Sequence, residues 1–250
     1  MLQVQQLVKY FGGVHAVDGV SFDVAAGECV ALIGPNGAGK STCFACIAGQ
    51  YPLTGGHVLW NGKALEKLAP AARLQHGVAR TFQVAQVFEA LTVLQNVQLT
   101  IQASIAHQAI SAFKRLDGQS REAASALLQE TGLIDVANED VLRLSYGAKK
   151  RLELAMALAA RPKLLLLDEP AAGLNHEECA EFGRLLKTLR DQHGISLLFV
   201  EHHMALVMGT CEKIIVLVHG QKIAQGTAEE IRNNPAVIEA YLGVDEDAHA

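Results

Sequence analysis

The stretch that decides the fold is Gly34-Pro35-Asn36-Gly37-Ala38-Gly39-Lys40-Ser41, which matches the pattern G-x-x-x-x-G-K-[ST] at every specified position. The apolar residues 29–33 precede it, as a buried strand would, and the helix-compatible residues 41–48 follow it. Glycines let the backbone wrap tightly enough for successive N–H groups to point into one concavity, and the start of a helix adds partial positive charge there. The stretch therefore predicts a strand, a loop and a helix that together hold the phosphates of a nucleotide.

The side chains of this loop have separate expected roles. Lys40 is expected to reach the β- and γ-phosphates, and the Ser41 hydroxyl is expected to bind Mg²⁺. The alternative is an ordinary glycine-rich turn between a strand and a helix, which the matching strand and helix patterns on either side argue against. The residues expected to contact ATP are Gly34, Pro35, Asn36, Gly37, Ala38, Gly39, Lys40, Ser41 and Thr42. The pattern predicts that a nucleotide binds and leaves its purpose open.

The composition is that of a globular protein. The chain has 250 residues, of which 50% are hydrophobic, so it can bury a sizeable core. Its formal net charge of −5 disfavours a nucleic-acid partner held by bulk charge, because such domains usually carry a basic patch. No uninterrupted apolar run approaches the ~18 residues that a membrane helix needs, and residues 1–6 lack the features of a secretory signal. We therefore expect the chain in the cytoplasm.

The cysteines point to core positions. The chain has 5 of them, an odd count without a repeating spacing, which argues against a disulfide framework. Cys43 and Cys46 form a C-x-x-C pattern on the helix expected after the phosphate loop, where they share a face. A redox or metal site is the alternative interpretation, and small buried core residues are the favoured one.

The pattern along the chain changes from alternating to helical and then to alternating strands and helices. Residues 2–24 alternate as in an antiparallel sheet, and residues 57–60 followed by Asn61-Gly62 predict a short hairpin. Residues 78–83 predict a strand, and residues 84–160 predict helices, among them residues 121–131 and a helix that begins at Ser145.

The second half predicts a mostly parallel sheet. The continuous apolar run 164–167 is typical of a strand buried on both faces, and residues 195–200 and 214–218 predict further core strands. Asn175 and Glu178 form a capping box that begins a helix between two of these strands. The predicted fold is therefore α/β: a mostly parallel core sheet with an N-terminal antiparallel β subdomain and an inserted α-helical subdomain.

Two carboxylates follow the strand 164–167 directly. Parallel sheets bind ligands at the carboxyl ends of their strands, so Asp168 is expected in the Mg²⁺ shell. Glu169 is expected to orient the attacking water or accept its proton, a task suited to phosphoryl transfer. The alternative is a strand that runs into a solvated turn. His202, just past the strand 195–200, can donate a hydrogen bond to a γ-phosphate, although a lone histidine there is often structural.

A second helix start can also bind an anion. Ser145 is an expected N-cap, and its hydroxyl and the Gly147 amide lie at the positive end of the helix that follows. One nucleotide hardly needs two such ends from the same chain. We therefore expect Ser145 to serve a nucleotide held by another copy, in a dimer with two-fold symmetry and ATP at the interface. The alternative is a plain capped helix.

The order of these motifs resembles that of ATP-binding cassette ATPases over essentially the whole chain, and most closely that of the ATP-binding subunits of branched-chain amino-acid importers. The residues that carry this resemblance are Phe11-Gly12-Gly13, Ala16-Val17, Arg80-Thr81-Phe82-Gln83, Ser145-Tyr146-Gly147, Asp168-Glu169, Ala171-Ala172-Gly173-Leu174-Asn175, His202, Asn233-Asn234-Pro235 and Tyr241-Leu242-Gly243.

The resemblance implies further site residues. Phe11 would stack on adenine with Val17 nearby, and Gln83 would touch Mg²⁺ or the attacking water and sense a membrane partner. Ser145 and Gly147 would contact the γ-phosphate of the opposite subunit, as would His202 within its own. Exposed-sheet packing of Phe11 and a solvated strand-end amide at Gln83 are the alternatives. The expected catalytic residues are thus Lys40, Gln83, Glu169 and His202, and the expected Mg²⁺ ligands are Ser41, Gln83 and Asp168.

The resemblance also implies a P-loop NTPase (RecA-like) core, a division of the chain and a set of partners. Residues 1–84 and 162–235 would form the nucleotide-binding core, residues 85–161 the helical subdomain, and residues 236–250 a C-terminal tail. The partners would be a second ATPase subunit, identical or related, a transmembrane permease and, indirectly, a periplasmic solute-binding protein, with no nucleic acid. The chain would lie peripherally on the cytoplasmic side of the cell membrane.

The sequence departs from the family pattern at three places. Ala148-Lys149-Lys150 stands where Gln-Gln-Arg is usual, His203 replaces an Asp, and Gln95 replaces a Glu in the surface that receives the permease. The alternative function is a non-transport ATPase of the same family, in DNA repair, translation or regulation. The short segment between Gln83 and Ser145 lacks the sustained heptads of repair relatives, and the chain carries a single cassette.

Overall fold

The central sheet carries the strands predicted from the apolar runs. The structure is a computed structural model, and it describes residues 1–81, 87–106 and 116–246. The strand order is β10-β9-β3-β8-β7-β6. All neighbours are parallel except β10, which is antiparallel to β9. The strands are β3 (Cys29–Ile33), β6 (Val78–Arg80), β7 (Leu164–Asp168), β8 (Ser196–Val200), β9 (Lys213–Val218) and β10 (Gln221–Gly226).

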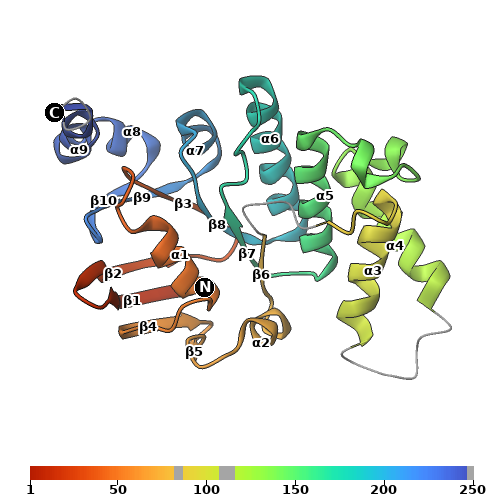
Figure 1. The fold of residues 1–250 in the computed structure, drawn as a ribbon, viewed down its shortest axis with the longest axis horizontal. Helices are drawn as coiled ribbons and strands as arrows, with labels where there is room; N and C mark the ends of the chain where they lie inside the picture. Colours follow the sequence, from red (N-terminus) through yellow and green to blue (C-terminus); the bar gives the residue numbers. More distant parts are fainter. Residues whose placement is uncertain (82–86, 107–115, 247–250) are drawn as a thin grey trace.

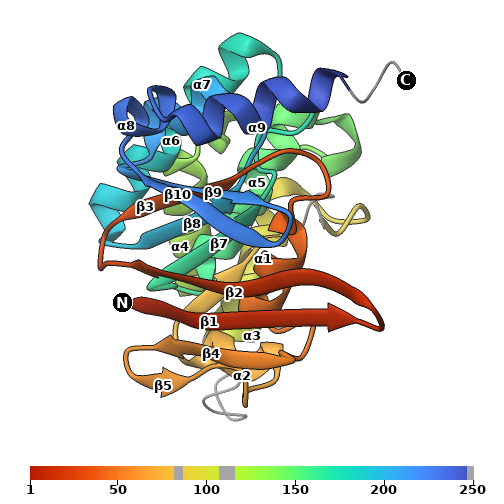
Figure 2. The ribbon, with the colours of Figure 1, turned by 90° about the vertical axis from the view of Figure 1, so that its left-hand side faces the viewer.

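A second, antiparallel sheet holds the N-terminal strands, as predicted. Its order is β2-β1-β4-β5, from β1 (Leu2–Phe11), β2 (Val14–Val24), β4 (Gly55–Trp60) and β5 (Lys63–Ala64). The expected hairpin turn at Asn61 and Gly62 has positive φ at both residues, 49° and 77°, as a type I′ turn requires. Helix α1 (Lys40–Ala48) lies between the two sheets, as Figure 2 shows, and Phe44 and Ile47 pack in a core shared with both.

The opposite face of the central sheet is covered by the later helices (Figure 1). Helix α6 (His176–His193) begins at the predicted capping box of Asn175 and Glu178 and buries Phe182, Leu186 and Leu189 against the sheet. Helices α7 (Met204–Thr210), α8 (Ala228–Arg232) and α9 (Pro235–Glu246) complete this layer, and α2 (Pro70–Gln75) precedes β6. Alternation of strands and covering helices confirms the α/β class.

The inserted helices form a block of their own at one side of the molecule (Figure 1). The block contains α3 (Val93–Ala106), α4 (Leu116–Glu130), α5 (Tyr146–Ala159) and the short 3₁₀ turns η1 (Ile134–Val136) and η2 (Val141–Arg143). Val97, Leu128 and Leu152 belong to its own buried cluster, whereas Leu154 and Leu158 of α5 pack with the core of the central sheet. Helix α5 therefore connects the inserted block to the sheet.

The structure differs from two of the local predictions and confirms a third. The predicted strand 78–83 ends at Arg80, and Gln83 lies outside the residues that the structure describes. The stretch 236–250, expected as a tail, is helical as far as Glu246, because Val237 is buried and Tyr241 packs against the core. Cys43 and Cys46 are buried as favoured, and burial raises the pKa of Cys46 to about 11.

Among the described residues, we find no helix both long and apolar enough to cross a membrane.

Candidate functional site

The phosphate loop packs against β2 of the antiparallel sheet and β9 of the central sheet. It runs from β3 to α1, whose first residue is Lys40 and whose N-cap is Gly39 with a φ of 92°. A Cβ atom on Gly39 would lie 2.2 Å from the carbonyl oxygen of Ala16, and one on Gly34 would lie 2.1 Å from that of Leu217. Because both contacts are with backbone, the loop can approach these strands only with glycine at both positions.

This close approach predicts a difference between two glycines of the loop. Gly37→Ala is expected to cost about 1 kcal/mol of unfolding free energy, because φ is positive while the space around it is open. Gly39→Ala is expected to cost roughly 3 kcal/mol, because backbone strain and a clash with Ala16 add. Urea unfolding of both variants measures this, and equal losses would contradict the packing described for Gly39.

Lys40 points back into the loop. Its Nζ atom donates hydrogen bonds to the carbonyl oxygens of Gly34, at 2.7 Å, and Pro35, at 2.8 Å. The residue is 4% exposed, and burial lowers the pKa of its ammonium group, while the negative charge of Glu169 partly offsets this shift. The amine is therefore held in the concavity of the loop, within the electrostatic reach of the Glu169 carboxylate that follows β7.

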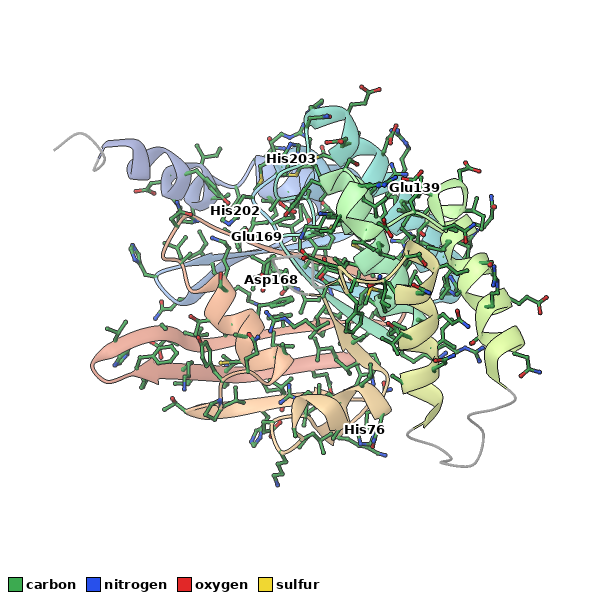
Figure 3. The ribbon with its side chains drawn as sticks, turned by 45° about the vertical axis from the view of Figure 1, so that its right-hand side comes forward. His76, Glu139, Asp168, Glu169, His202 and His203 are labelled. Atoms are coloured by element: carbon green, nitrogen blue, oxygen red, sulfur yellow. The ribbon has the colours of Figure 1, made fainter. Side chains whose placement is uncertain are left out.

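Asp168, Glu169 and His202 lie together at the carboxyl ends of β7 and β8 (Figure 3). Oδ2 of Asp168 accepts a hydrogen bond from Nη2 of Arg80 at 2.7 Å. Oε1 of Glu169 lies 3.2 Å from Nε2 of His202. The structure thus brings together the carboxylates and the histidine that the sequence singled out.

Glu169 has an unusual backbone. Its φ is 47°, a left-handed value that non-glycine residues rarely adopt, and its N–H donates to the carbonyl oxygen of Val200 at 3.0 Å. This turn ends β7 and directs the Glu169 side chain toward His202. Strain of this kind is frequent where a side chain must be aimed at a site.

Glu201 is a positioning residue that the sequence did not single out. Its carboxylate accepts hydrogen bonds from the backbone N–H groups of Ala171 at 2.8 Å, His202 at 2.8 Å and His203 at 3.0 Å. The residue is 3% exposed. It therefore fixes the loop that carries His202 to the loop that follows Glu169, a contact between segments distant in sequence.

Ser145 and Gly147 lie apart from this cluster in the chain. The Ser145 hydroxyl accepts from the N–H of Ala148 at 3.2 Å, which confirms it as the N-cap of α5. Both residues line a depression with Leu133, Arg151 and Glu178, and no residue of the phosphate loop lines it. Within one chain, the start of α5 at Ser145 therefore does not complete the phosphate site at the start of α1.

Phe11 and Val17, the two residues expected near the adenine of the nucleotide, differ in their exposure. Phe11 is 43% exposed and meets the ring of Tyr51 edge-on, with centroids 5.4 Å apart, so part of its surface is accessible. Val17 is fully buried in the core beneath the antiparallel sheet. Its alternating position on β2 faces inward, and its place beside the nucleotide, implied by the family resemblance, stays a prediction.

The donor chemistry fits Mg²⁺. The hydroxyl of Ser41, which is exposed at the start of α1, and the carboxylate of Asp168 are hard oxygen ligands. Within the described residues, no group of three or more His, Cys, Asp or Glu side chains could hold a metal ion. Mg²⁺ is commonly bound by one or two protein ligands together with substrate phosphates, so this sparse set suits it. Gln83, the third expected ligand, lies outside the described residues.

Comparisons with known proteins extend over nearly the whole chain. Residues 17–172 match the family described as ABC transporter, and residues 221–247 match the family described as branched-chain amino acid ATP-binding cassette transporter. The chain is 41% identical to the high-affinity branched-chain amino acid transport ATP-binding protein LivG of Salmonella typhimurium, with 97% of this chain and 98% of that protein covered.

Solved structures agree with these matches. A nucleotide-free ATP-binding cassette from an ABC transporter superposes with a TM-score of 0.84 at 31% identity, covering 96% of this chain and 98% of that one. A dimeric post-hydrolysis state of an ATP-binding cassette bound to ADP and Pi superposes with a TM-score of 0.77 at 26% identity, covering 91% and 99%.

Proposed function

Since the chain belongs to the ABC transporter family and is an ATP-hydrolysing subunit that works with transmembrane permease subunits, we propose that it powers the uptake of branched-chain amino acids. The observation that carries this proposal is the joint presence of the Glu169–His202 pair beside the phosphate loop and of a C-terminal segment, residues 221–247, that matches the branched-chain amino acid cassettes. The first supports hydrolysis, and the second supports the substrate class.

Each side chain of the site has its own role toward the bound nucleotide. Lys40 and the loop amides hold the β- and γ-phosphates, and Phe11 stacks on the adenine. Ser41 and Asp168, with Gln83, hold Mg²⁺, which when bound neutralises part of the negative charge on the phosphate oxygens. Glu169 orients a water molecule and accepts its proton as the water oxygen bonds to the γ-phosphorus and the bond to ADP breaks. His202, held 3.2 Å from Glu169, donates to the γ-phosphate.

The site is completed by a second copy of an ATPase subunit. Ser145 and Gly147 offer a hydroxyl, an amide and a helix N-terminus at a depression that no residue of their own phosphate loop lines. Their pairing with the phosphate loop of a partner fills both sites of a dimer with two-fold symmetry. The dimeric cassette among the similar structures supports this arrangement. ATP then favours the closed dimer, because only the closed state uses both ends.

Ser145→Arg is expected to block this closure while leaving the chain's own phosphate loop intact. A long cationic side chain at the interface would prevent the helix start from reaching the γ-phosphate of the partner. We expect phosphate release to fall by roughly 100-fold, the loss typical of one oxyanion-stabilising group. ATP affinity, measured by equilibrium dialysis, should stay close to that of the wild type.

The control for this variant places the same cation elsewhere on the inserted helices. Gln119→Arg changes an exposed residue of α4 and should release phosphate at the wild-type rate. Equal rates in the Ser145→Arg and Gln119→Arg proteins would contradict the role of Ser145.

The inserted helices form the surface for the permease. A groove between them and the core is lined by Leu74, Phe88, Met156 and further apolar and polar side chains. We place residues 1–84 and 162–235 in the nucleotide-binding core and residues 85–161 in this permease-facing subdomain. The chain is peripheral on the cytoplasmic side of the membrane, and the periplasmic solute-binding protein contacts it only through the permease.

Uptake by a reconstituted complex tests this function. The tagged chain, solubilised with its membranes in mild detergent, is expected to co-purify with an integral membrane permease. Proteoliposomes of that complex should accumulate labelled leucine when ATP is supplied, and the same complex with Lys40→Ala should not. If the chain hydrolyses ATP but no membrane protein co-purifies with it, a non-transport member of the family is favoured instead.

A further inference from the structure

We propose that Arg80 is a positioning residue that occupies the Asp168 carboxylate in the metal-free protein and competes with Mg²⁺ for it. This inference rests on the proposed function, in which Asp168 binds the metal. Nη2 of Arg80 lies 2.7 Å from Oδ2 of Asp168, and the two side chains are only 16% and 13% exposed. The carboxylate therefore has a fixed positive partner from its own chain.

The sheet places the guanidinium at the metal side of the strands. Arg80 ends β6 and is paired in register with Leu166 of β7, two residues before Asp168. Side chains in register, and those two residues apart, project from the same face of a sheet. Arg80, Leu166 and Asp168 thus share the face that α1 covers. The phosphate loop leads into the same helix, so the arginine approaches the site from within the fold.

An aromatic ring fixes the other side of the guanidinium. The central carbon of the Arg80 guanidinium lies 5.3 Å from the ring centroid of Phe44, a fully buried residue of α1. This distance is typical of a cation–π contact, which is stronger when water is excluded. Arg80 is therefore held between α1 and the end of β7, and the ion pair is more than a surface contact that solvent and salt would weaken.

Arg80 and the metal ion compete for the Asp168 carboxylate because both are positively charged. A guanidinium and a divalent cation that approach the same carboxylate repel each other, and in a partly buried site this repulsion is only weakly screened. Without Arg80, the metal-free state would keep Asp168 buried without its cation, which destabilises that state and not the metal-bound one. Arg80 therefore lowers the affinity for the metal. Once the γ-phosphate has left, the same competition favours release of the metal with ADP.

Arg80→Met tests this competition, because it keeps much of the length and apolar volume of the side chain and removes the charge. The probe is Mn²⁺ with ADP, with the bound metal counted by electron paramagnetic resonance, so that no turnover is needed. We expect Mn²⁺ to bind at least about tenfold more tightly in the presence of ADP, since loss of one partner of a buried charge pair shifts equilibria by this much or more. The metal-free variant should also unfold at a lower temperature than the wild type.

Two further variants keep the test decisive. Arg80→Gln retains a hydrogen-bond donor without the charge and should tighten Mn²⁺ binding in the same way even if Arg80→Met fails to fold. Arg80→Lys retains the charge and should return the affinity toward that of the wild type. Arg190→Met is the matched control: Arg190 pairs with Glu212, which precedes β9 and so lies at the opposite end of the strands. Its loss should leave Mn²⁺ affinity unchanged.

The outcomes separate the inference from the function on which it rests. Asp168→Asn should sharply weaken Mn²⁺ binding, and if it does not, the assignment of Asp168 as a metal ligand is wrong. If Asp168→Asn behaves as expected but neutral variants at Arg80 bind Mn²⁺ as weakly as the wild type, or more weakly, the competition does not exist. In that case Arg80 only supports the carboxylate.

Discussion

The Lys40→Ala variant is expected to lose ATP binding, with an affinity at least about 100-fold weaker, or ~2.7 kcal/mol. Lys40 is the buried cation of the phosphate loop, and its amine now satisfies two carbonyl oxygens of that loop, those of Gly34 and Pro35. Incoming phosphate oxygens would take over these hydrogen bonds and add the attraction of opposite charges. Alanine removes both these hydrogen bonds and this attraction, and it leaves the two carbonyl oxygens facing the phosphates.

Fluorescent-nucleotide titration of the purified protein measures this loss. Lys187→Ala, which removes an exposed lysine from α6, is the control and should bind like the wild type. Circular dichroism should show both variants folded. If Lys40→Ala retained the affinity of the wild type, the role of the loop as the nucleotide site would be refuted.

The Glu169→Gln variant is expected to bind ATP normally and to hydrolyse it roughly 100- to 1000-fold more slowly, the range typical of losing a general base. The amide can still accept a hydrogen bond and is nearly the same size, but it cannot take a proton from water. Because closure of the dimer depends on ATP and its opening on hydrolysis, the variant should accumulate as a dimer. Phosphate release and size-exclusion chromatography with ATP measure the two effects.

A neutralised glutamate elsewhere controls for charge. Glu239→Gln changes an exposed residue of α9 and should hydrolyse ATP at the wild-type rate. A Glu169→Gln protein that stayed monomeric with ATP and released phosphate at the normal rate would remove Glu169 from the mechanism. The contact of Glu169 with His202 would then be only structural.

The core strands of this fold could be predicted because their sequences carry the signal of burial on both faces. Residues 164–167 and 214–218 are continuous apolar runs, and both form central strands. Strand β10 carries no such signal, because it is an edge strand in which Ala224 is the buried residue. Helix α9 reads as a tail because the burial of Val237 and Tyr241 arises only when the chain returns to the sheet.

The same contrast holds for the site. The positions of Lys40, Glu169 and His202 in the fold could be predicted, since each lies within two residues of a core strand or a glycine-rich loop, and local sequence determines both. The ion pair of Arg80 with Asp168 joins residues 88 positions apart, and the contact of Glu201 with Ala171 joins residues 30 apart. These contacts depend on which strands are neighbours, which no local pattern contains.

The central claim is that each active site needs a second chain, and the rate of phosphate release per chain at increasing protein concentration tests it most directly. If Ser145 completes the site of a partner, the rate per chain is nearly zero in dilute solution, rises as dimers form, and stays low at every concentration for Ser145→Arg. A rate per chain that is the same at all concentrations, with Ser145→Arg as fast as the wild type, would contradict the account.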